Sequence, residues 1–512
     1  MSTSRTQISR RAGQLLAILL LGPGAAPAQQ GPVVRTDLGA VRGVALGRGA
    51  AFRGIPFAAP PVGSLRWKEA RPAAPWHGIR PATSFGALCP QPTDARTARL
   101  PQSEDCLTLN IVTPDLKAHG LPVLFSVHGG AFYVGSGRYI ADRDLSPIIK
   151  RGVVLVSPNY RLGRLGFFAH PALTAEAGHG TGNFWLSDQI AALQWTRRNI
   201  ARFGGDPGKV TILGCSAGGS SINALMASPA ARGLFARAGA HSAGGFFNAT
   251  RPLDIAETQG VDFAQRAGVS GKAPDTLHRL RALSVTRILA ADPGPPNFGA
   301  IVDGRLLPRQ ISMIFARGEQ ARVPFITGST SNEASVFGLM GFDSTALRDR
   351  FGIDMKALRP VYDADGPLTD AELLRRVQTD FIFTAASMGM ASLAARSAPA
   401  WSYHFDYVQS ANRTTMPGAP HCADMPYLIG LPDDAPPADQ AIARKIQSYW
   451  YNFIVRGDPN GPDLAAWPRI VPGAIEPLVM TDTFQAVRDF EGARIRLWFA
   501  KWRAENRLSM LP

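Results

Sequence analysis

The stretch Val210-Thr-Ile-Leu-Gly-Cys-Ser-Ala-Gly218 decides the fold class. Its first four residues form a short, mostly β-branched and apolar run that predicts a buried strand, and the small residues of Ala217–Ala227 predict a helix directly after it. Between strand and helix stands the pattern Gly-x-Ser-x-Gly. A sharp strand–turn–helix with a serine at its tip is typical of a nucleophile elbow, because only small neighbours allow the turn. The stretch therefore predicts Ser216 as a nucleophile held clear of a sheet.

The chain around this turn alternates between strand patterns and helix patterns. The apolar run Leu121–Val127 ends at Gly129-Gly130, and the segment Leu186–Phe203 carries apolar residues at helical spacing. This alternation predicts an α/β fold whose sheet is mostly parallel and has helices on both faces. Residues 245–320 and 335–398 look mainly helical and irregular, and we expect them to be insertions that roof the active site. The other expected strands are Val153–Val156, Val323–Thr327 and Trp401–Tyr407.

The composition is that of a globular chain and excludes several classes of protein. Hydrophobic residues make up 45% and charged residues 18% of the 512 positions, which excludes a disordered chain. No repeat with a period of roughly 20–50 residues is present, which argues against solenoids and propellers. The net charge is +15, but the basic residues are scattered rather than clustered among aromatic residues. We therefore expect no nucleic-acid partner.

The N-terminus has the order of a secretory signal peptide. Arg10-Arg11 precedes the apolar run Leu15–Leu21, and Ala26-Pro-Ala28 supplies small residues for cleavage. The run is too short to span a bilayer, and no later stretch is long and apolar enough, so we expect no stable membrane insertion. The sequence predicts a signal peptide over residues 1–28, a single domain over residues 29–512, and export to the periplasm or the extracellular space by the Sec or the twin-arginine route.

A reaction at Ser216 that forms an oxyanion would need backbone N–H donors from a second part of the chain. The stretch His128-Gly-Gly-Ala-Phe132 follows the strand expected at Leu121–Val127, and its glycines allow a turn whose N–H groups face the serine. The helix after the serine adds the positive end of its dipole. A tight turn without a chemical role is the alternative interpretation of this stretch.

A serine nucleophile also needs a base and an acid, which follow it in this fold in the order serine, acid, histidine. His404 lies inside a strand pattern and His241 too early in the chain, whereas His421 lies in a loop after a late strand. Glu333 follows the turn after the strand expected at Val323–Thr327 and is the candidate acid, with a solvated loop carboxylate as the alternative. The histidines that follow the serine are His241, His278, His404 and His421.

Several further motifs stand in a fixed order along the chain. They are Gly54-Ile-Pro-Phe-Ala-Ala-Pro-Pro-Val-Gly63 with Arg66-Trp67, Ser103-Glu-Asp-Cys-Leu-Thr-Leu-Asn110, Asn159-Tyr-Arg-Leu162, Gly182-Asn183, Asp188-Gln189, Phe203-Gly-Gly-Asp-Pro207, Gly328-Ser-Thr-Ser-Asn-Glu333 and Gly457-Asp-Pro-Asn460. With the elbow, these motifs resemble the type-B carboxylesterase family of α/β-hydrolases, which also contains the cholinesterases. The resemblance covers nearly the whole mature chain.

The resemblance implies a hydrolase that cleaves carboxylic esters through an acyl-enzyme. A small-molecule ester is the implied partner, and no metal or organic cofactor is implied. A non-catalytic adhesion relative on the same fold is disfavoured, because such relatives lack the serine or the histidine. Carried over residue by residue, the catalytic triad is Ser216, Glu333 and His421, and the oxyanion donors are the N–H groups of Gly130, Ala131 and Ala217.

Two departures from the family pattern fall beside the catalytic residues. The family usually has Glu before the nucleophile, where this chain has Cys215, and Gly after the histidine, where it has Cys422. If Ser216 and His421 lie within hydrogen-bond reach, the two cysteines are neighbours, and a disulfide needs Cα atoms about 4.4–6.8 Å apart. A similar Cys-Ser and His-Cys pairing occurs in the tannase and feruloyl-esterase family. We therefore predict a Cys215–Cys422 disulfide, with two buried free thiols as the alternative.

The other two cysteines, Cys89 and Cys106, then form the second pair, which matches the N-terminal disulfide loop of the resembled family. An even number of cysteines in an exported chain favours disulfides. The loop between these two cysteines holds no aromatic residue, so it lacks the Trp expected of a cation–π choline site.

Two rival enzymatic functions stay open at this point. The cysteine pair beside the triad suggests a tannase-like or feruloyl-esterase-like hydrolase of aromatic acid esters. A lipase is the other alternative, and it would be activated above the concentration at which its substrate forms micelles. The sequence carries no signal for an oligomeric state.

Overall fold

In the computed structural model, the described residues are 31–95, 97–142, 146–244, 250–272, 275–292, 298–339 and 343–506. The signal peptide predicted over residues 1–28 lies outside them. From Pro32 onward the chain clusters into one compact unit. Within the described ranges, none of the helices combines the length and the apolar character needed to cross a membrane.

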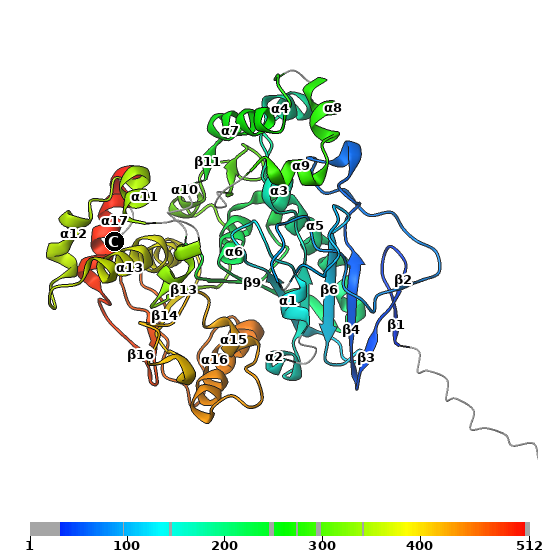
Figure 1. Cartoon of the computed structure of the whole chain (residues 1–512). Helices are drawn as coiled ribbons and strands as arrows, with labels where there is room; N and C mark the ends of the chain where they lie inside the picture. Colours follow the sequence, from blue (N-terminus) through cyan, green and yellow to red (C-terminus); the bar gives the residue numbers. More distant parts are fainter. Residues whose placement is uncertain are drawn as a thin grey trace, which may run out of the picture. The chain divides into compact units, whose positions relative to one another are not determined.

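The expected parallel strands form the middle of a large mixed sheet (Figure 1). Neighbouring strands in its middle run parallel, and the strands toward both edges are antiparallel. The α/β-hydrolase fold predicted from the sequence is confirmed by this arrangement. Among the described residues the order in the eleven-stranded sheet is β16 (Phe484–Ala486), β15 (Leu478–Met480), β14 (Ala400–Phe405), β13 (Phe325–Thr330), β10 (Arg237–His241), β9 (Gly205–Cys215), β7 (Leu121–Val127), β8 (Val154–Pro158), β6 (Thr108–Thr113), β4 (Gly49–Pro56) and β3 (Val44–Leu46).

Smaller sheets and many helices complete the described part of the chain. A three-stranded sheet contains β1 (Val33–Arg35), β2 (Ala40–Arg42) and β5 (Ile79–Pro81), and a two-stranded one contains β11 (Arg251–Pro252) and β12 (Ile301–Val302). The helices are α1 (Arg138–Ala141), α2 (Pro147–Lys150), α3 (Gly163–Gly166), α4 (Pro171–Ala177), α5 (Phe184–Asn199), α6 (Ala217–Ala227), α7 (Leu253–Arg266), α8 (Asp275–Arg281), α9 (Val285–Ala290), α10 (Ile311–Ala316), α11 (Ser344–Phe351), α12 (Met355–Tyr362), α13 (Asp370–Thr379), α14 (Ala385–Ala394), α15 (Met425–Ile429), α16 (Pro437–Arg456) and α17 (Gly492–Asn506). A π-helical turn, η5 (Asp380–Thr384), joins α13 to α14, and a 3-10 helix, η4 (Glu333–Leu339), follows β13.

Strand alternation gives the large sheet two hydrophobic cores, which are the two larger of the four buried apolar clusters among the described residues. On β9, Ile212 belongs to the first core and Leu213 to the second; on β13, Phe325 and Ile326 divide in the same way. Successive side chains of a strand point to opposite faces, so each face of the sheet acquires its own core. Helices α5, α6 and α14 contact the strands within the first core, and α16 covers the second (Figure 1).

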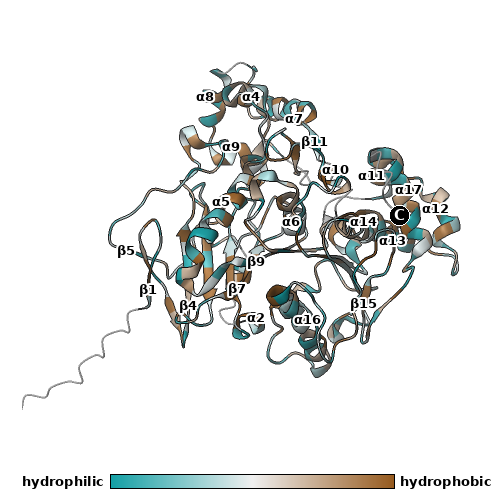
Figure 2. Ribbon diagram, turned by 180° about the vertical axis from the view of Figure 1, so that it is seen from behind, coloured by the Kyte–Doolittle hydropathy of each residue, from teal (hydrophilic) through white to brown (hydrophobic). Residues whose placement is uncertain are grey.

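The two expected insertions contain helices α7 to α10 and α11 to α14, so the helical prediction is correct for their described residues. The outer helices show both hydrophilic and hydrophobic colours in Figure 2, as amphipathic surface helices do. The expectation that the whole second stretch is a roof is wrong for α14. Its residues are small or apolar on every side and all buried, because the helix packs against β13 and β14 as part of the core.

Two strands extend beyond their predicted ends, because polar or glycine residues continue the hydrogen-bonded pairing with the neighbouring strand. Strand β9 begins at Gly205, five residues before the predicted strand, because Gly205 pairs with Leu121; a register shift separates this pair from the next, Val123 with Val210. Strand β13 runs on to Thr330, because Gly328-Ser-Thr330 pairs with the end of β14. This extension carries the chain directly to the loop that holds Glu333.

His404 is a packed residue of β14, as the sequence predicts. Its side chain is 7% exposed, its ring lies 4.8 Å from that of Phe490, and its Nδ1 is 3.2 Å from the Ser329 hydroxyl. Burial, helped by the charge of Arg494, lowers the pKa of His404 to about 3. The folded protein therefore favours the neutral ring, whereas the unfolded chain takes up a proton near pH 6.5. The contribution of the neutral His404 to the free energy of unfolding is present above pH 6.5 and is lost as the pH falls toward about 3.

We expect His404→Gln to reduce the change in the free energy of unfolding between neutral and acidic pH. From pH 8 to pH 5 the wild-type histidine should remove roughly 2 kcal/mol from the free energy of unfolding, and the glutamine cannot take up this proton. Urea unfolding at both pH values measures the difference. His77→Gln, at an exposed histidine, is the matched control. Equal pH dependence in the wild type and in His404→Gln would contradict the assignment.

Candidate active site

Ser216 lies on a sharp turn between β9 and α6. Its backbone has φ 60° and ψ −126°, which is a conformation that non-glycine residues rarely adopt, and its N–H donates to the carbonyl of His241 at 3.0 Å. A Cβ on Gly214 would lie 2.5 Å from the carbonyl carbon of Gly218, and a Cβ on Gly218 would lie 2.3 Å from the carbonyl oxygen of Val127. Both glycines of the pattern are therefore needed for the turn to close.

The turn after β7 lies against this elbow. A Cβ on Gly129 would come within 2.7 Å of the carbonyl oxygen of Cys215, so the two backbones are nearly in contact. The next three residues, Gly130, Ala131 and Phe132, have φ values of 107°, 54° and 59°. The start of the turn lies against the first turn of α6, since a Cβ on Gly218 would lie 3.0 Å from the carbonyl carbon of His128, and the N–H of Ala217 has no partner within that helix.

His128, at the start of the same turn, has a structural role. Its ring stacks on that of Tyr160 at 4.3 Å, and the Tyr160 hydroxyl donates to the His128 carbonyl at 2.9 Å. Burial lowers the pKa of His128 to about 4, so the ring is neutral at physiological pH. The residue supports the turn through packing and hydrogen bonds.

Glu333 and His421 are brought together by two loops that are far apart in sequence. Glu333 is fully buried at the start of η4, and one of its carboxylate oxygens accepts the N–H of Thr330 at 2.7 Å. The other oxygen is hydrogen-bonded to Nδ1 of His421. The Nε2 of His421 is buried and has no hydrogen-bond partner among the described residues. Because Glu333 is bonded to Nδ1, Nε2 is the ring nitrogen that is left for a proton transfer.

The loop that carries His421 is tied to the loop that carries Glu333. The N–H of Asn332 donates to the carbonyl of Ala419 at 2.9 Å, and the N–H of Ala419 donates to the hydroxyl of Ser331 at 2.8 Å. The N–H of His421 itself donates to the hydroxyl of Ser335 at 2.9 Å. Sequence reasoning missed both serines, because a hydroxyl in a loop has no pattern that reveals a distant partner.

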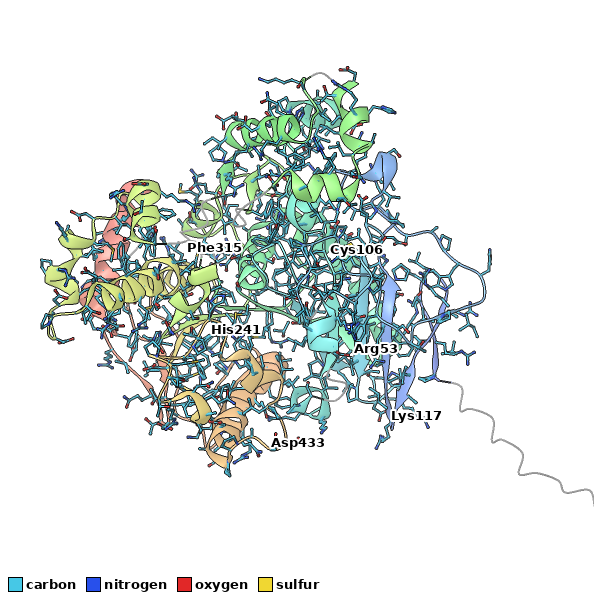
Figure 3. The ribbon with its side chains drawn as sticks, in the orientation of Figure 1. Arg53, Cys106, Lys117, His241, Phe315 and Asp433 are labelled. Atoms are coloured by element: carbon cyan, nitrogen blue, oxygen red, sulfur yellow. A yellow bond between two sulfur atoms is a disulfide. The ribbon has the colours of Figure 1, made fainter. Side chains whose placement is uncertain are left out.

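Disulfides pair Cys215 with Cys422 and Cys89 with Cys106, the same pairs that the sequence predicts. The Cα atoms are 6.1 Å apart in the first pair and 5.0 Å apart in the second. The first bridge joins the residue before Ser216 to the residue after His421. The second lies close to β6, where Cys106 is labelled in Figure 3.

Two other acids that could compete with Glu333 are held elsewhere. Asp424, three residues after His421, lies 2.5 Å from Nδ1 of His241 and accepts the hydroxyl of Tyr403 at 2.6 Å. Burial opposes its ionisation, but the charge of His241 and the hydrogen bonds outweigh burial and lower the pKa of Asp424. The second acid, Asp303, accepts from the side chain of Asn183 at 2.8 Å and from the N–H of Leu307 at 2.9 Å.

A cavity of about 400 Å³ opens beside the turn after β7. Its walls are mostly apolar and come from that turn, from the loop between Cys89 and Cys106, and from α15. Within the described ranges, no group of three or more His, Cys, Asp or Glu residues is arranged to hold a metal ion. The lining includes Gln91, His128, Gly130, Tyr139, Cys215 and Met425.

Comparison with known proteins decides the family. The model of the carboxylesterase family matches residues 30–498. The chain belongs to the carboxylesterase family. It is a type-B member, and the activity of the family is the hydrolysis of carboxylic esters.

Curated relatives and solved structures agree with this assignment. The para-nitrobenzyl esterase of Bacillus subtilis (strain 168) is 32% identical, over 90% of this chain and 97% of its own length. The fumonisin B1 esterase of Sphingopyxis macrogoltabida is 33% identical, over 91% and 90%. A solved structure of PNB esterase matches this carboxylesterase with a TM-score of 0.79 at 31% identity, over 91% of this chain and 99% of that one.

Proposed function

We propose that this carboxylesterase is an exported enzyme that cleaves esters through an acyl-enzyme formed on Ser216, with His421 as base and Glu333 as orienting acid. The observation that carries the proposal is the hydrogen bond between Glu333 and Nδ1 of His421, in a loop bridged to the elbow of Ser216 by the Cys215–Cys422 disulfide. This bond leaves Nε2 as the ring nitrogen that exchanges a proton with the serine and the leaving group.

The reaction begins when the hydroxyl of Ser216 attacks the ester carbonyl and its proton passes to Nε2 of His421. The negative charge of the tetrahedral intermediate is held by the N–H groups of Gly130, Ala131 and Ala217. The imidazolium then gives its proton to the departing alcohol, and water repeats the sequence on the acyl-enzyme. Glu333 keeps the proton on Nδ1 and stabilises the imidazolium while it exists.

Export is supported by two independent features. The N-terminal segment over residues 1–28 has the order of a signal peptide. Two disulfides, Cys89–Cys106 and Cys215–Cys422, suit an oxidising compartment, since disulfides are rare where thiols are kept reduced. After removal of the signal, we propose that residues 29–512 act as one catalytic domain.

A panel of esters on the purified mature protein tests the function. It should include para-nitrobenzyl esters, because the Bacillus subtilis relative is named for them, and a series of aliphatic acyl chains. A strong preference for gallate or ferulate esters would favour the tannase-like alternative, and activation above the micelle concentration would favour a lipase. A folded wild-type protein that hydrolyses none of these esters would overturn the proposal.

The Cys215–Cys422 disulfide should matter more for turnover than the Cys89–Cys106 disulfide. It joins residues 207 positions apart beside the serine and the base, and the chain-entropy model gives it a stabilisation of roughly 5 kcal/mol. Small misplacements of reacting groups cost up to about 100-fold in rate. Because hydrogen bonds to the Glu333 loop also hold His421, we expect Cys422→Ser to lower kcat roughly 10-fold to 100-fold without abolishing it.

Turnover measured during titration with a reductant, alongside thermal unfolding, checks this expectation. Activity should fall before the protein unfolds, and Cys89→Ser is the matched control. Peptide mapping without reduction gives the direct test. Recovery of Cys215 and Cys422 as free thiols from fully active enzyme would contradict the proposed role of the bridge.

A further inference from the structure

The turn that would hold the oxyanion is strained and needs external support. Ala131 and Phe132 both have positive φ although neither is glycine, and residues in this strained conformation persist only where the surrounding structure holds them. Within the turn, the carbonyl of Gly130 accepts the N–H groups of Tyr133 and Val134 at 2.9 Å. These internal bonds close the turn, but they do not place it relative to the elbow.

The first half of the turn is anchored by packing. The ring of Phe132 lies 4.8 Å from that of Phe167 and 5.0 Å from that of Trp185, and it is 4% exposed. The carbonyl of Phe132 accepts the N–H of Gly163 at 2.8 Å. This side of the turn therefore has a buried aromatic anchor and a backbone anchor.

The other side of the turn faces the cavity of about 400 Å³, which is lined by Gly129, Gly130, Val134 and Gly135. Packing against a cavity is incomplete, so it contributes less to holding these residues than a filled core would. Gly135 returns against the start of the turn, since a Cβ there would lie 2.5 Å from the carbonyl oxygen of Gly129. A residue that holds Gly135 in place therefore also holds Gly129 and Gly130 in place.

Gln91 makes this second anchor. Its side-chain oxygen accepts the N–H of Gly135 at 2.8 Å, and its side-chain nitrogen donates to the carbonyl of the same residue at 3.0 Å. The nitrogen also donates to the carbonyl of Cys89 at 3.0 Å, and the Gln91 N–H donates to the side chain of Gln102 at 2.9 Å. The residue is 2% exposed, so none of these bonds is weakened by competition with bulk water.

We propose that Gln91 is a positioning residue for the oxyanion turn. The amide makes two hydrogen bonds to the backbone of Gly135, one as donor and one as acceptor, as a neighbouring β-strand would. These bonds hold the turn and so fix the N–H groups of Gly130 and Ala131. The inference rests on the proposed oxyanion role of those groups. The Gln91 amide is bonded to the backbone of Gly135 and Cys89, so it acts through the turn.

Gln91→Met should therefore lower kcat with little change in KM. The methionine fills the same space but cannot make either bond to Gly135. Loss of one oxyanion donor costs about 100-fold to 1000-fold in kcat, and we expect a displaced donor to cost roughly 10-fold to 100-fold. Affinity for an aryl trifluoromethyl ketone, which forms an oxyanion on the serine, should weaken by the same factor.

Gln102→Met is the matched control. It removes the bond to the Gln91 N–H in the same disulfide loop and leaves the amide on Gly135, so its kcat and ketone affinity should stay within about 3-fold of the wild-type values. Thermal unfolding of both variants is measured in parallel. If Gln91→Met does not fold, Gln91→Glu serves instead, because its carboxyl group keeps an acceptor for Gly135 and has at most one donor in place of the two N–H donors of the amide.

The outcomes separate this inference from the proposed function. A normal kcat and ketone affinity in Gln91→Met, with active wild type, would overturn the positioning role alone. Equal losses in Gln91→Met and Gln102→Met would also overturn it, since they would reflect the integrity of the loop. An inactive wild type would overturn both proposals.

Discussion

Replacement of Ser216 by alanine is expected to reduce kcat for ester hydrolysis roughly 10⁶-fold, the usual cost of removing a triad nucleophile. The fold should survive, because the Ser216 side chain makes no capping hydrogen bond to α6 and alanine fits the same turn. Ester hydrolysis by the purified variant, with circular dichroism and thermal unfolding, measures both expectations.

Ser220→Ala is the matched control for this change. Ser220 lies one turn further along α6, and its hydroxyl donates to the carbonyl of Ala243. It should keep activity near that of the wild type. If the Ser216 variant retained more than a few per cent of the wild-type rate, another residue would be the nucleophile.

Glu333→Gln is expected to lower kcat roughly 10³-fold to 10⁴-fold, by analogy with the acid of serine proteases. The amide keeps the size of the side chain, but it can donate to Nδ1 of His421 and so favours the wrong tautomer of the ring. Binding of substrate should change little, because Glu333 is fully buried beneath the histidine. Steady-state kinetics at several pH values measures the loss.

Asp424→Asn and Asp303→Asn distinguish this assignment from its competitors. Asp424 is only three residues from His421 but is bonded to His241 and Tyr403, and Asp303 is bonded to Asn183. Both variants should lose far less activity than Glu333→Gln. Near-normal activity in Glu333→Gln, with collapse in either aspartate variant, would reassign the acid.

Local sequence predicts the elbow well because its determinants are local. Strand β7 and helix α6 have the predicted bounds, since an apolar run and a run of small residues define them without distant partners. Gly214 and Gly218 are required by contacts within a few residues of the turn and with the neighbouring strand. Such features are visible in a short window of sequence.

The supports of the site are less visible because they depend on long-range contacts. Ser331 and Ser335 hold a loop almost 90 residues away in sequence, with separations of 88 and 86 positions, and Gln91 contacts Gly135 across 44. Nothing in the spacing of a serine or a glutamine signals such a partner. Asp424 shows the opposite case, since closeness in sequence to His421 does not make it the partner of the base.

Covalent labelling with a fluorophosphonate tests the central claim most directly, because the reagent reacts only with a serine activated by a base and an oxyanion site. The purified mature enzyme is treated until activity is lost, and peptides are mapped by mass spectrometry. The account predicts one adduct per molecule, on Ser216, with labelling lost in Ser216→Ala and strongly slowed in Glu333→Gln. An adduct on another serine that accounts for the lost activity, or full activity with Ser216 labelled, would contradict it.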